Sequence, residues 1–355
     1  MGEQPGTRTA APCGAHNRPC SHCVQTKAAD APLSTIALMN SSPNQRAERS
    51  DNGQRRDRSW PPSPERLPAP VTDNHAHLDF VDGDEQLSVE QQILAARAVG
   101  VTGVITIGCD LDAARWTHRL ISGDVEQPAE ADLFAKHLRA GLSIHPNTAV
   151  EHRRGEDRHG NPLPPLEDAI AEIADLLDHP QVVTIGETGL DWFRTSRKKD
   201  AYRAAQVDSF RAHIALAKEK QLPMQIHDRE AHQDVLTVLD QDGIPDRTVL
   251  HCFSGDAEFA EACVDRGAYL SFAGPVTFTA NDSLREALAA TPLNRVMVET
   301  DAPFLTPMPY RGRPNSSYLI PHTMQVIAEV KGISLEEACS AVQTTTREVY
   351  GWTAA

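Results

Sequence analysis

A chain of 355 residues, of which 40% are hydrophobic and 23% charged, has the composition of an ordinary globular protein and is long enough to bury a large core. Its formal net charge of -15 argues against a protein that coats nucleic acid non-specifically, because phosphate binding by counterion release normally needs a basic surface. An enzyme that acts on phosphodiesters stays possible, since bound cations would supply positive charge locally.

No segment approaches the roughly eighteen continuous apolar residues of a membrane span, and the N-terminus lacks the basic-then-apolar order of a secretory signal. We therefore expect a cytoplasmic protein with no membrane partner. The seven cysteines are scattered and odd in number, so they do not indicate the disulfide framework of a small secreted protein.

Residues 1–70 are rich in Pro, Ser, Arg, Asn and Gln and carry almost no apolar periodicity. Because such a segment cannot bury enough surface to order itself, we expect a disordered polar tail that ends in a proline-rich run. Two alternatives stay open for this tail. Cys20 and Cys23 have the spacing of half a small zinc site, without the second pair that would complete it, and Met39 offers a second start of translation.

Beyond residue 70, short apolar runs alternate with helical patterns, as in repeated β-α units around a parallel sheet. One intervening helix is clear, because Val207, Phe210, Ile214 and Ala217 recur at three- and four-residue spacing. The expected strands are 71–78, 103–108, 138–145, 182–187, 223–227, 248–252, 268–272 and 295–301. This repeat number and a body of about 280 residues predict an α/β fold, a (β/α)8 TIM barrel, for residues 71–355.

Residues that can bind metals stand at the carboxyl ends of several expected strands. Glu187, His227, His251 and Asp301 each close such a run or lie next to its end. In a barrel these ends meet at one mouth, where barrel enzymes keep their chemistry. We therefore expect the four side chains to face one another although they are far apart in the sequence.

His75 and His77 lie two residues apart on the first expected strand, so both rings point to the same face. Any one of the six residues alone is ordinarily a capping, solvated or hydrogen-bonded core residue. The complete set indicates a metal site, because buried charges need partners or metals. Imidazole with carboxylate suits Zn, Mn, Fe or Co without excluding Mg, and so many ligands are enough for two ions.

Five blocks of sequence stand out in this part of the chain. They are 73–78 (DNHAHL), 186–192 (GETGLDW), 222–229 (LPMQIHDR), 251–255 (HCFSG) and 299–305 (ETDAPFL). In content and order these blocks resemble the motifs of the TatD family of metal-dependent deoxyribonucleases, within the amidohydrolase-like barrels. The resemblance runs from Asp73 to about Tyr350 and leaves the expected tail uncovered.

The resemblance implies a hydrolase that cleaves DNA phosphodiester bonds, on ends or single strands, with no obligate protein partner. A hydroxide that bridges two divalent ions (Zn, Mn or Mg) would attack phosphorus, and Asp301 would take part in proton transfer. Glu187 would bridge the ions, one of them held by His75, His77 and Asp301 and the other by His227 and His251. The implied catalytic residues are Glu187, Asp301 and Arg229, and the implied metal ligands are His75, His77, Glu187, His227, His251 and Asp301.

Two roles are open for Arg229: it could contact phosphate, or it could form a salt bridge with Asp191 or Asp228. His145 follows the third expected strand, and Asn147 stands where many family members have a second histidine, so a role of His145 in substrate contact or in an extra ion stays open. The basic runs 194–199 and 310–313 follow strands that carry ligands. They either meet a nucleic-acid backbone at the barrel mouth or are solvated surface.

Two other functions stay open at this point. A hydrolase with the same metals could act on an ester or amide, as a deacylase does, because the fold does not fix the substrate. A catalytically silent binding protein could keep the barrel, although the presence of every ligand type speaks against it.

Overall fold

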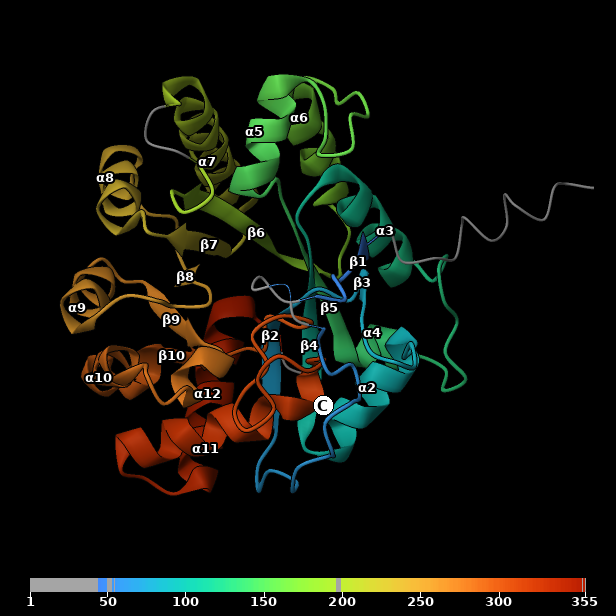
Figure 1. Cartoon of the computed structure of the whole chain (residues 1–355). Helices are drawn as coiled ribbons and strands as arrows, with labels where there is room; N and C mark the ends of the chain where they lie inside the picture. Colours follow the sequence, from blue (N-terminus) through green and yellow to red (C-terminus); the bar gives the residue numbers. More distant parts are fainter. Residues whose placement is uncertain (1–43, 50–52, 54, 196–198, 353, 355) are drawn as a thin grey trace, which may run out of the picture. The chain divides into compact units, whose positions relative to one another are not determined.

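The computed structural model describes residues 44–49, 53, 55–195, 199–352 and 354. Within these residues a parallel sheet of eight strands curves into a barrel with the helices outside it (Figure 1). Neighbouring strands follow the order β10-β9-β8-β7-β6-β5-β4-β2. The predicted (β/α)8 barrel is therefore confirmed.

The strands of the barrel begin and end close to the expected positions. They are β2 (Val71–Ala76), β4 (Val101–Gly108), β5 (Leu138–Leu142), β6 (Val182–Asp191), β7 (Met224–Arg229), β8 (Thr248–Leu250), β9 (Tyr269–Phe272) and β10 (Val296–Val298). Two of the ends that differ from the prediction bear on the candidate site. β6 runs on to Asp191, and β10 stops at Val298, so Asp301 lies beyond its strand. Asp301 has a positive φ of 54°, which takes the chain out of the extended conformation there.

Helices follow most of the strands and cover the barrel. They are α2 (Val89–Ala98), α3 (Leu111–Ile121), α4 (Leu133–His137), α5 (Pro146–Arg154), α6 (Leu166–Leu176), α7 (Asp200–Lys220), α8 (His232–Asp242), α9 (Ala257–Asp265), α10 (Asp282–Ala290), α11 (Ile320–Lys331) and α12 (Leu335–Tyr350). Short 3-10 turns are η1 (Gly274–Thr277), η2 (Leu293–Arg295) and η3 (Ser317–Leu319). The helix expected around Phe210 is α7, and it buries Phe210, Ile214 and Ala217. No described helix combines the length and apolar character needed to cross a membrane.

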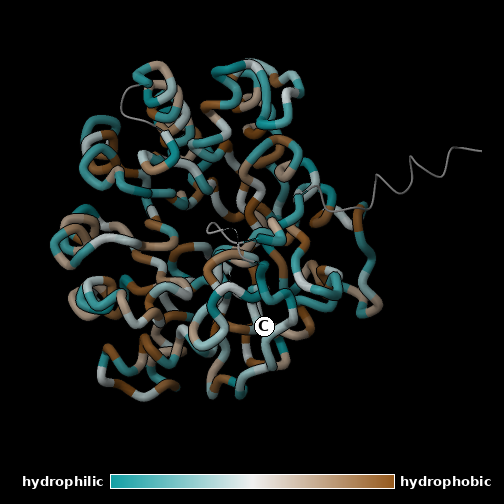
Figure 2. Tube along the Cα trace, viewed as in Figure 1, coloured by the Kyte–Doolittle hydropathy of each residue, from teal (hydrophilic) through white to brown (hydrophobic). Residues whose placement is uncertain are grey.

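Local sequence signals explain where several helices begin. Ser88 accepts a hydrogen bond from Gln91 N at the start of α2, and the Gln91 side chain reaches back to form a capping box. Ser334 and Glu337 form the same box at the start of α12. Along the outer helices, hydrophobic and hydrophilic residues alternate (Figure 2), as expected for helices that bury one face against a sheet.

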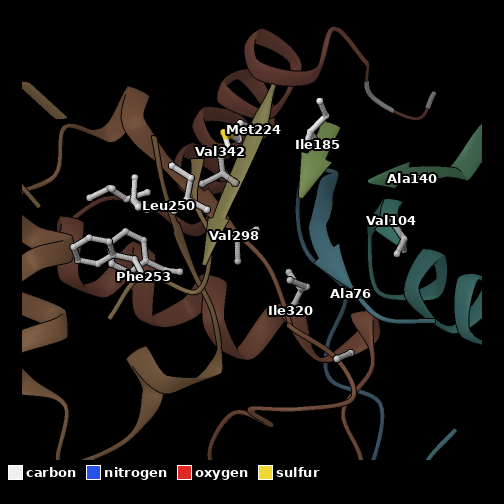
Figure 3. Packing of buried hydrophobic residues seen from close by; sticks show 14 of the residues in the cluster. Ala76, Val104, Ala140, Ile185, Met224, Leu250, Phe253, Val298, Ile320 and Val342 are labelled. Carbon is white, nitrogen blue, oxygen red and sulfur yellow. The ribbon is translucent and has the colours of Figure 1, made fainter. Parts of the chain in front are cut away.

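One apolar cluster fills the inside of the barrel, and a second lies between the sheet and the helices. Ile105 and Ile107 of β4 pack with Val183, Val249 and Met297, and these residues come from alternate strands, as in the filled interior of a barrel. Val104, which precedes Ile105 and points to the opposite face of β4, belongs to the larger cluster between strands and helices (Figure 3). The barrel interior is thus packed with side chains, and its chemistry is confined to the mouth.

The barrel closes between β10 and β2 through main-chain bonds beside the expected ligands. Asp301 N donates to His75 O at 2.9 Å, and His77 N donates to Ala302 O at 2.7 Å. Ala76 and Ala302 form a parallel bridge at the same place. Closure of the sheet therefore brings His75, His77 and Asp301 together.

The described part of the N-terminal segment makes specific contacts and so differs from the disordered tail expected for residues 1–70. β1 (Asn44–Gln45) pairs in parallel with β3 (Phe80–Val81). Arg46 and Arg56 both bond to the carboxylate of Asp82, and Leu67 is buried in the core. Individual hydrogen bonds hold this segment, and periodicity does not reveal them. Residues 1–43, which include Cys20, Cys23 and Met39, lie outside the described residues.

Candidate metal centre

The structure brings together all six residues predicted as metal ligands. His75 lies on β2, Glu187 on β6 and His227 on β7, and the other three follow β2, β8 and β10. The buried members are His75, His77, Glu187 and His251, while His227 and Asp301 are partly exposed. The site therefore has a closed floor and an opening beside His227 and Asp301.

Glu187 lies at the centre of the cluster, and its two oxygens face different imidazoles. Oε1 is 3.9 Å from His77 Nε2. Oε2 is 2.5 Å from His251 Nε2 and 3.1 Å from His227 Nδ1. This carboxylate is thus oriented to serve two positive centres at once.

A glycine allows β6 and β7 to approach closely beside Glu187. Gly189 is in register with His227, and a Cβ on Gly189 would overlap the carbonyl oxygen of His227. Its φ of 143° is also one that other residues rarely adopt. Glycine at this position therefore brings the backbones that carry Glu187 and His227 together.

Asp301 faces the two histidines of the first strand. Its Oδ1 is 3.4 Å from His77 Nε2 and 3.7 Å from His75 Nε2, and the two Nε2 atoms are 3.3 Å apart. β2 ends at Ala76, so His77 lies just past the strand. The two rings still converge, as the two-residue spacing predicts.

Three of the imidazoles are held through their second ring nitrogen. The pairs are His75 Nδ1 with Gln225 Oε1 at 2.6 Å, His77 Nδ1 with Ile107 O at 3.1 Å and His251 Nδ1 with Glu299 Oε1 at 3.1 Å. Each of these oxygens accepts a hydrogen bond, so the ring proton belongs on Nδ1. The lone pair of Nε2 is then free to bind a metal, the arrangement found around metal-binding histidines.

In His227 the nitrogen that faces the centre of the cluster is Nδ1, not Nε2. Its Nδ1 faces Glu187, and its Nε2 is 3.6 Å from Asp191 Oδ2. Nε2 is buried and has no hydrogen-bond partner among the described residues. Asn147 Nδ2 donates to the same oxygen of Asp191 at 2.8 Å. Asp191 is therefore placed to accept the Nε2 proton and leave Nδ1 free for a cation.

His145 joins the cluster as a donor. Its Nδ1 accepts a hydrogen bond from Asn147 N at 3.0 Å, so in the neutral ring the proton lies on Nε2. Nε2 is 3.6 Å from Glu187 Oε1. One ring nitrogen each of His145 and His227 and one Glu187 oxygen lie within 4.8 Å of one another, close enough to hold an ion. The protonated Nε2 of His145, however, cannot bind an ion. The geometry favours substrate contact over an extra ion for His145.

Charge and burial together shift the pKa values of the site. Burial lowers the pKa of His75 well below its ordinary value. Burial also acts to lower the pKa of His227, but Asp191 and Glu187 outweigh it and raise that pKa to about 9. Burial would raise the pKa of Glu187, yet His251 and His145 hold it well below its usual range. The site thus attracts positive charge strongly, and its imidazole and carboxylate donors fit a divalent metal.

Sequence reasoning missed Gln225 and Glu299, which hydrogen-bond to the ring nitrogens of His75 and His251. It also missed Asp191, whose carboxylate faces His227 Nε2 at 3.6 Å. A signal for two of them was available. Gln225 lies two residues before His227, and Glu299 lies two residues before Asp301, so a strand would place each pair on one face. The long distance in sequence between each orienting residue and its histidine hides the pairing itself.

The basic residues near the mouth differ in what they contact. Arg229 makes no ion pair with Asp191 or Asp228 among the described residues, and its guanidinium lies 3.8 Å from the centre of the Phe193 ring. Arg313 donates to the main chain of Ser59 and Trp60. Residues 196–198 of the first basic run lie outside the described part of the chain. Arg313 is therefore occupied by the N-terminal segment, while Arg229 faces an exposed aromatic ring.

A parallel barrel that carries four imidazoles and two carboxylates at its mouth defines a metal-dependent hydrolase. Comparison with known proteins agrees with this class. Residues 72–351 match the family model described as TatD related DNase. The chain belongs to the TatD family of metal-dependent hydrolases.

The similarity to this chain extends over nearly the whole length of several relatives. A protein of Mycobacterium tuberculosis named an uncharacterized metal-dependent hydrolase TatD is 38% identical over 283 residues, which are 79% of this chain and 98% of the relative. A protein of Citrobacter rodentium named a 3'-5' ssDNA/RNA exonuclease TatD is 30% identical over 271 residues, 74% of this chain and 92% of the relative. The crystal structure of YjjV, a TatD homolog from Escherichia coli K12, superposes with a TM-score of 0.65 at 23% identity and covers 80% of this chain and 98% of its own, a likeness of fold.

Proposed function

We propose that this hydrolase is a deoxyribonuclease that cleaves DNA phosphodiester bonds with two divalent ions, Zn, Mn or Mg. The orientation of Glu187 carries the proposal, since its Oε1 faces His77 at 3.9 Å while its Oε2 faces His251 and His227 at 2.5 and 3.1 Å. Glu187 would then be the ligand that two ions share, and paired ions stabilise both the attacking and the leaving oxygen of a displacement at phosphorus. The name of the Citrobacter relative supports a nucleic acid as substrate.

We assign the ligands in two groups that share Glu187. One ion would be held by His75, His77 and Asp301, and the other by His227 and His251. Gln225, Asp191 and Glu299 would keep the imidazoles in their orientation. Bound divalent ions supply an activated water molecule and neutralise charge on the phosphate oxygens.

Three side chains would act on the substrate directly. Asp301 turns Oδ1 towards the histidines, and we assign its Oδ2 the role of accepting a proton from the attacking water. His145 would donate from Nε2 to a phosphate oxygen. Arg229 makes no side-chain hydrogen bond to another described residue, so its N–H groups are available to phosphate.

The test is to incubate metal-stripped protein with DNA, an aminoacyl ester and a simple phosphodiester, and to add back Mg, Mn or Zn singly. We expect DNA to be degraded only with metal, and Glu187→Ala or Asp301→Asn to abolish the degradation. Glu336→Ala, an exposed carboxylate on α12, is the matched control and should keep full activity. Turnover of the ester without turnover of DNA would contradict the nuclease, and calorimetry that detects no bound metal would contradict the ligand assignment.

A further inference from the structure

Phe193 exposes a large apolar ring at the mouth of the barrel. It is 57% exposed, and among the described residues the other exposed large hydrophobic side chains are Leu94 and Met308. Phe193 follows the end of β6, the strand that carries Glu187, and therefore lies on the same face of the barrel as the metal centre. Core packing does not explain why a phenylalanine stands at this position, because an exposed ring does not provide the stabilisation that a buried aromatic side chain does.

A positive charge covers part of the ring. The guanidinium carbon of Arg229 lies 3.8 Å from the ring centre, a close cation-π contact. Arg229 is the last residue of β7 and pairs in register with Asp191 at the end of β6. The two side chains thus come from neighbouring strand ends, and the exposed fraction of Phe193 leaves the rest of its surface to solvent.

The register of β6 and β7 also shows how close Phe193 and Arg229 lie to the candidate metal centre. His227 precedes Arg229 by two residues on β7, which corresponds to about 7 Å along a strand. Asp191, which precedes Phe193 by two residues, is 3.6 Å from His227 Nε2. The pair therefore stands directly outside the ligand His227, on the partly exposed side of the site.

We propose that Phe193 and Arg229 form a stacking platform for an unpaired nucleobase of single-stranded DNA beside the metal centre. This inference rests on the proposed nuclease function and adds the residues that would distinguish single-stranded from double-stranded DNA. Proteins that bind single strands combine an aromatic face, on which any base stacks, with positive charge along the backbone. A base inside a duplex is already stacked and paired, so the platform selects unpaired ends and single strands.

A protein partner fits the same surface less well. Phe193 is exposed singly, and its neighbours Arg194 and Arg229 are charged and exposed, so the described residues form no contiguous apolar patch around it. The core of a protein interface is depleted in charged residues and usually spans a continuous apolar area. The observations therefore favour a base over a protein side chain as the occupant.

The experiment compares oligothymidylate with an abasic oligonucleotide of the same length, using the metal-loaded protein. We expect Phe193→Ala to raise KM for oligothymidylate about tenfold with kcat nearly unchanged, because stacking contributes to binding of the strand. KM for the abasic strand should be the same in the variant and the wild type. Phe193→Trp should restore the wild-type KM. Leu94→Ala removes another exposed apolar side chain, on α2, and should change KM for neither strand.

Binding measurements separate failure of the platform from failure of the nuclease. Fluorescence anisotropy with a labelled oligothymidylate gives a dissociation constant even where no hydrolysis occurs. Base-dependent binding that Phe193→Ala weakens supports the platform, whether or not the strand is cleaved. Equal affinity of variant and wild type, an equal loss on the abasic strand, or an altered oligomeric state in the variant would each overturn it.

Discussion

Glu299 holds His251 from the side opposite Glu187. Its Oε1 is 3.1 Å from His251 Nδ1 and also accepts a hydrogen bond from Cys252 N at 2.8 Å. Glu299 is fully buried, and burial raises its pKa although His251 acts to lower it. The imidazole of His251 is therefore fixed between two carboxylates, with Nε2 directed to the metal centre.

Glu299→Gln should weaken metal binding while leaving the fold intact. The amide keeps the shape of the side chain but removes the negative charge that makes the imidazole a stronger donor. Loss of such an orienting partner typically lowers metal affinity about 10- to 100-fold. Calorimetric titration with Zn or Mn measures the change, and Glu336→Gln on the surface of α12 serves as the control. An unchanged affinity in Glu299→Gln would show that Glu299 does not support a ligand.

Metal affinity should rise with pH until about pH 9. The pKa of His227 is raised to about 9, and Glu187 and Glu299 raise the pKa of His251 against the effect of burial. At neutral pH these rings hold protons that a metal has to displace, so binding releases protons and is weaker at low pH. Calorimetry in buffers of different ionisation enthalpy counts the released protons. Binding that releases none between about pH 6 and 8 would contradict this account.

The clustering of the candidate ligands could be predicted from the sequence, because four of them stand at or next to the end of an apolar run and the ends of parallel strands meet. The ring orientations could not, since the pairing of His75 with Gln225 joins residues 150 positions apart. Docking of the N-terminal segment was missed for the same reason. It depends on single contacts such as Arg46 with Asp82, which leave no periodic pattern. The sequence therefore predicts which elements carry the chemistry, while the partners of each side chain follow from packing in three dimensions.

His213 should make stability depend on pH between about 4 and 6.5. It is buried in α7, its Nδ1 donates to Ser209 O at 2.7 Å, and its Nε2 accepts from Ile144 N at 3.1 Å. Burial lowers its pKa to about 4. A depressed pKa means that the unfolded chain binds the proton more readily. The stabilisation from the neutral ring is therefore complete above about pH 6.5 and is lost as the pH falls towards 4.

Between the ordinary pKa of 6.5 and the lowered pKa of about 4, this contribution amounts to about 3 kcal/mol. Urea unfolding at pH 7 and at pH 4.5 measures the loss in the wild type. His213→Gln should show a smaller difference between the two pH values, because the amide cannot be protonated in this range. His159→Gln, at an exposed position, should behave as the wild type. Equal pH dependence in all three proteins would exclude His213 as the cause.

Asp82 should anchor the N-terminal segment to the mouth of the barrel. Its carboxylate is 1% exposed and lies 2.6 Å from Arg56 and 3.2 Å from Arg46. Arg46 also donates to the carbonyl of Pro303, in the loop that follows Asp301. Asp82→Ala leaves two arginines without their shared partner, and removal of one side of a buried ion pair typically costs about 3–5 kcal/mol. We expect a loss of this order in the free energy of unfolding.

Hydrogen exchange followed by mass spectrometry shows where the loss acts. In Asp82→Ala, the amides of residues 55–60 and 303–313 should exchange faster, while those of β7 should not change, because the contacts of Asp82 lie on the Asp301 side of the mouth. Asp178→Ala is the matched control, since Asp178 pairs with Lys220 at 2.7 Å but is 73% exposed. An exposed pair contributes about 1 kcal/mol or less. If both variants lose the same small amount, the N-terminal segment is held by its main-chain contacts and Asp82 is not its anchor.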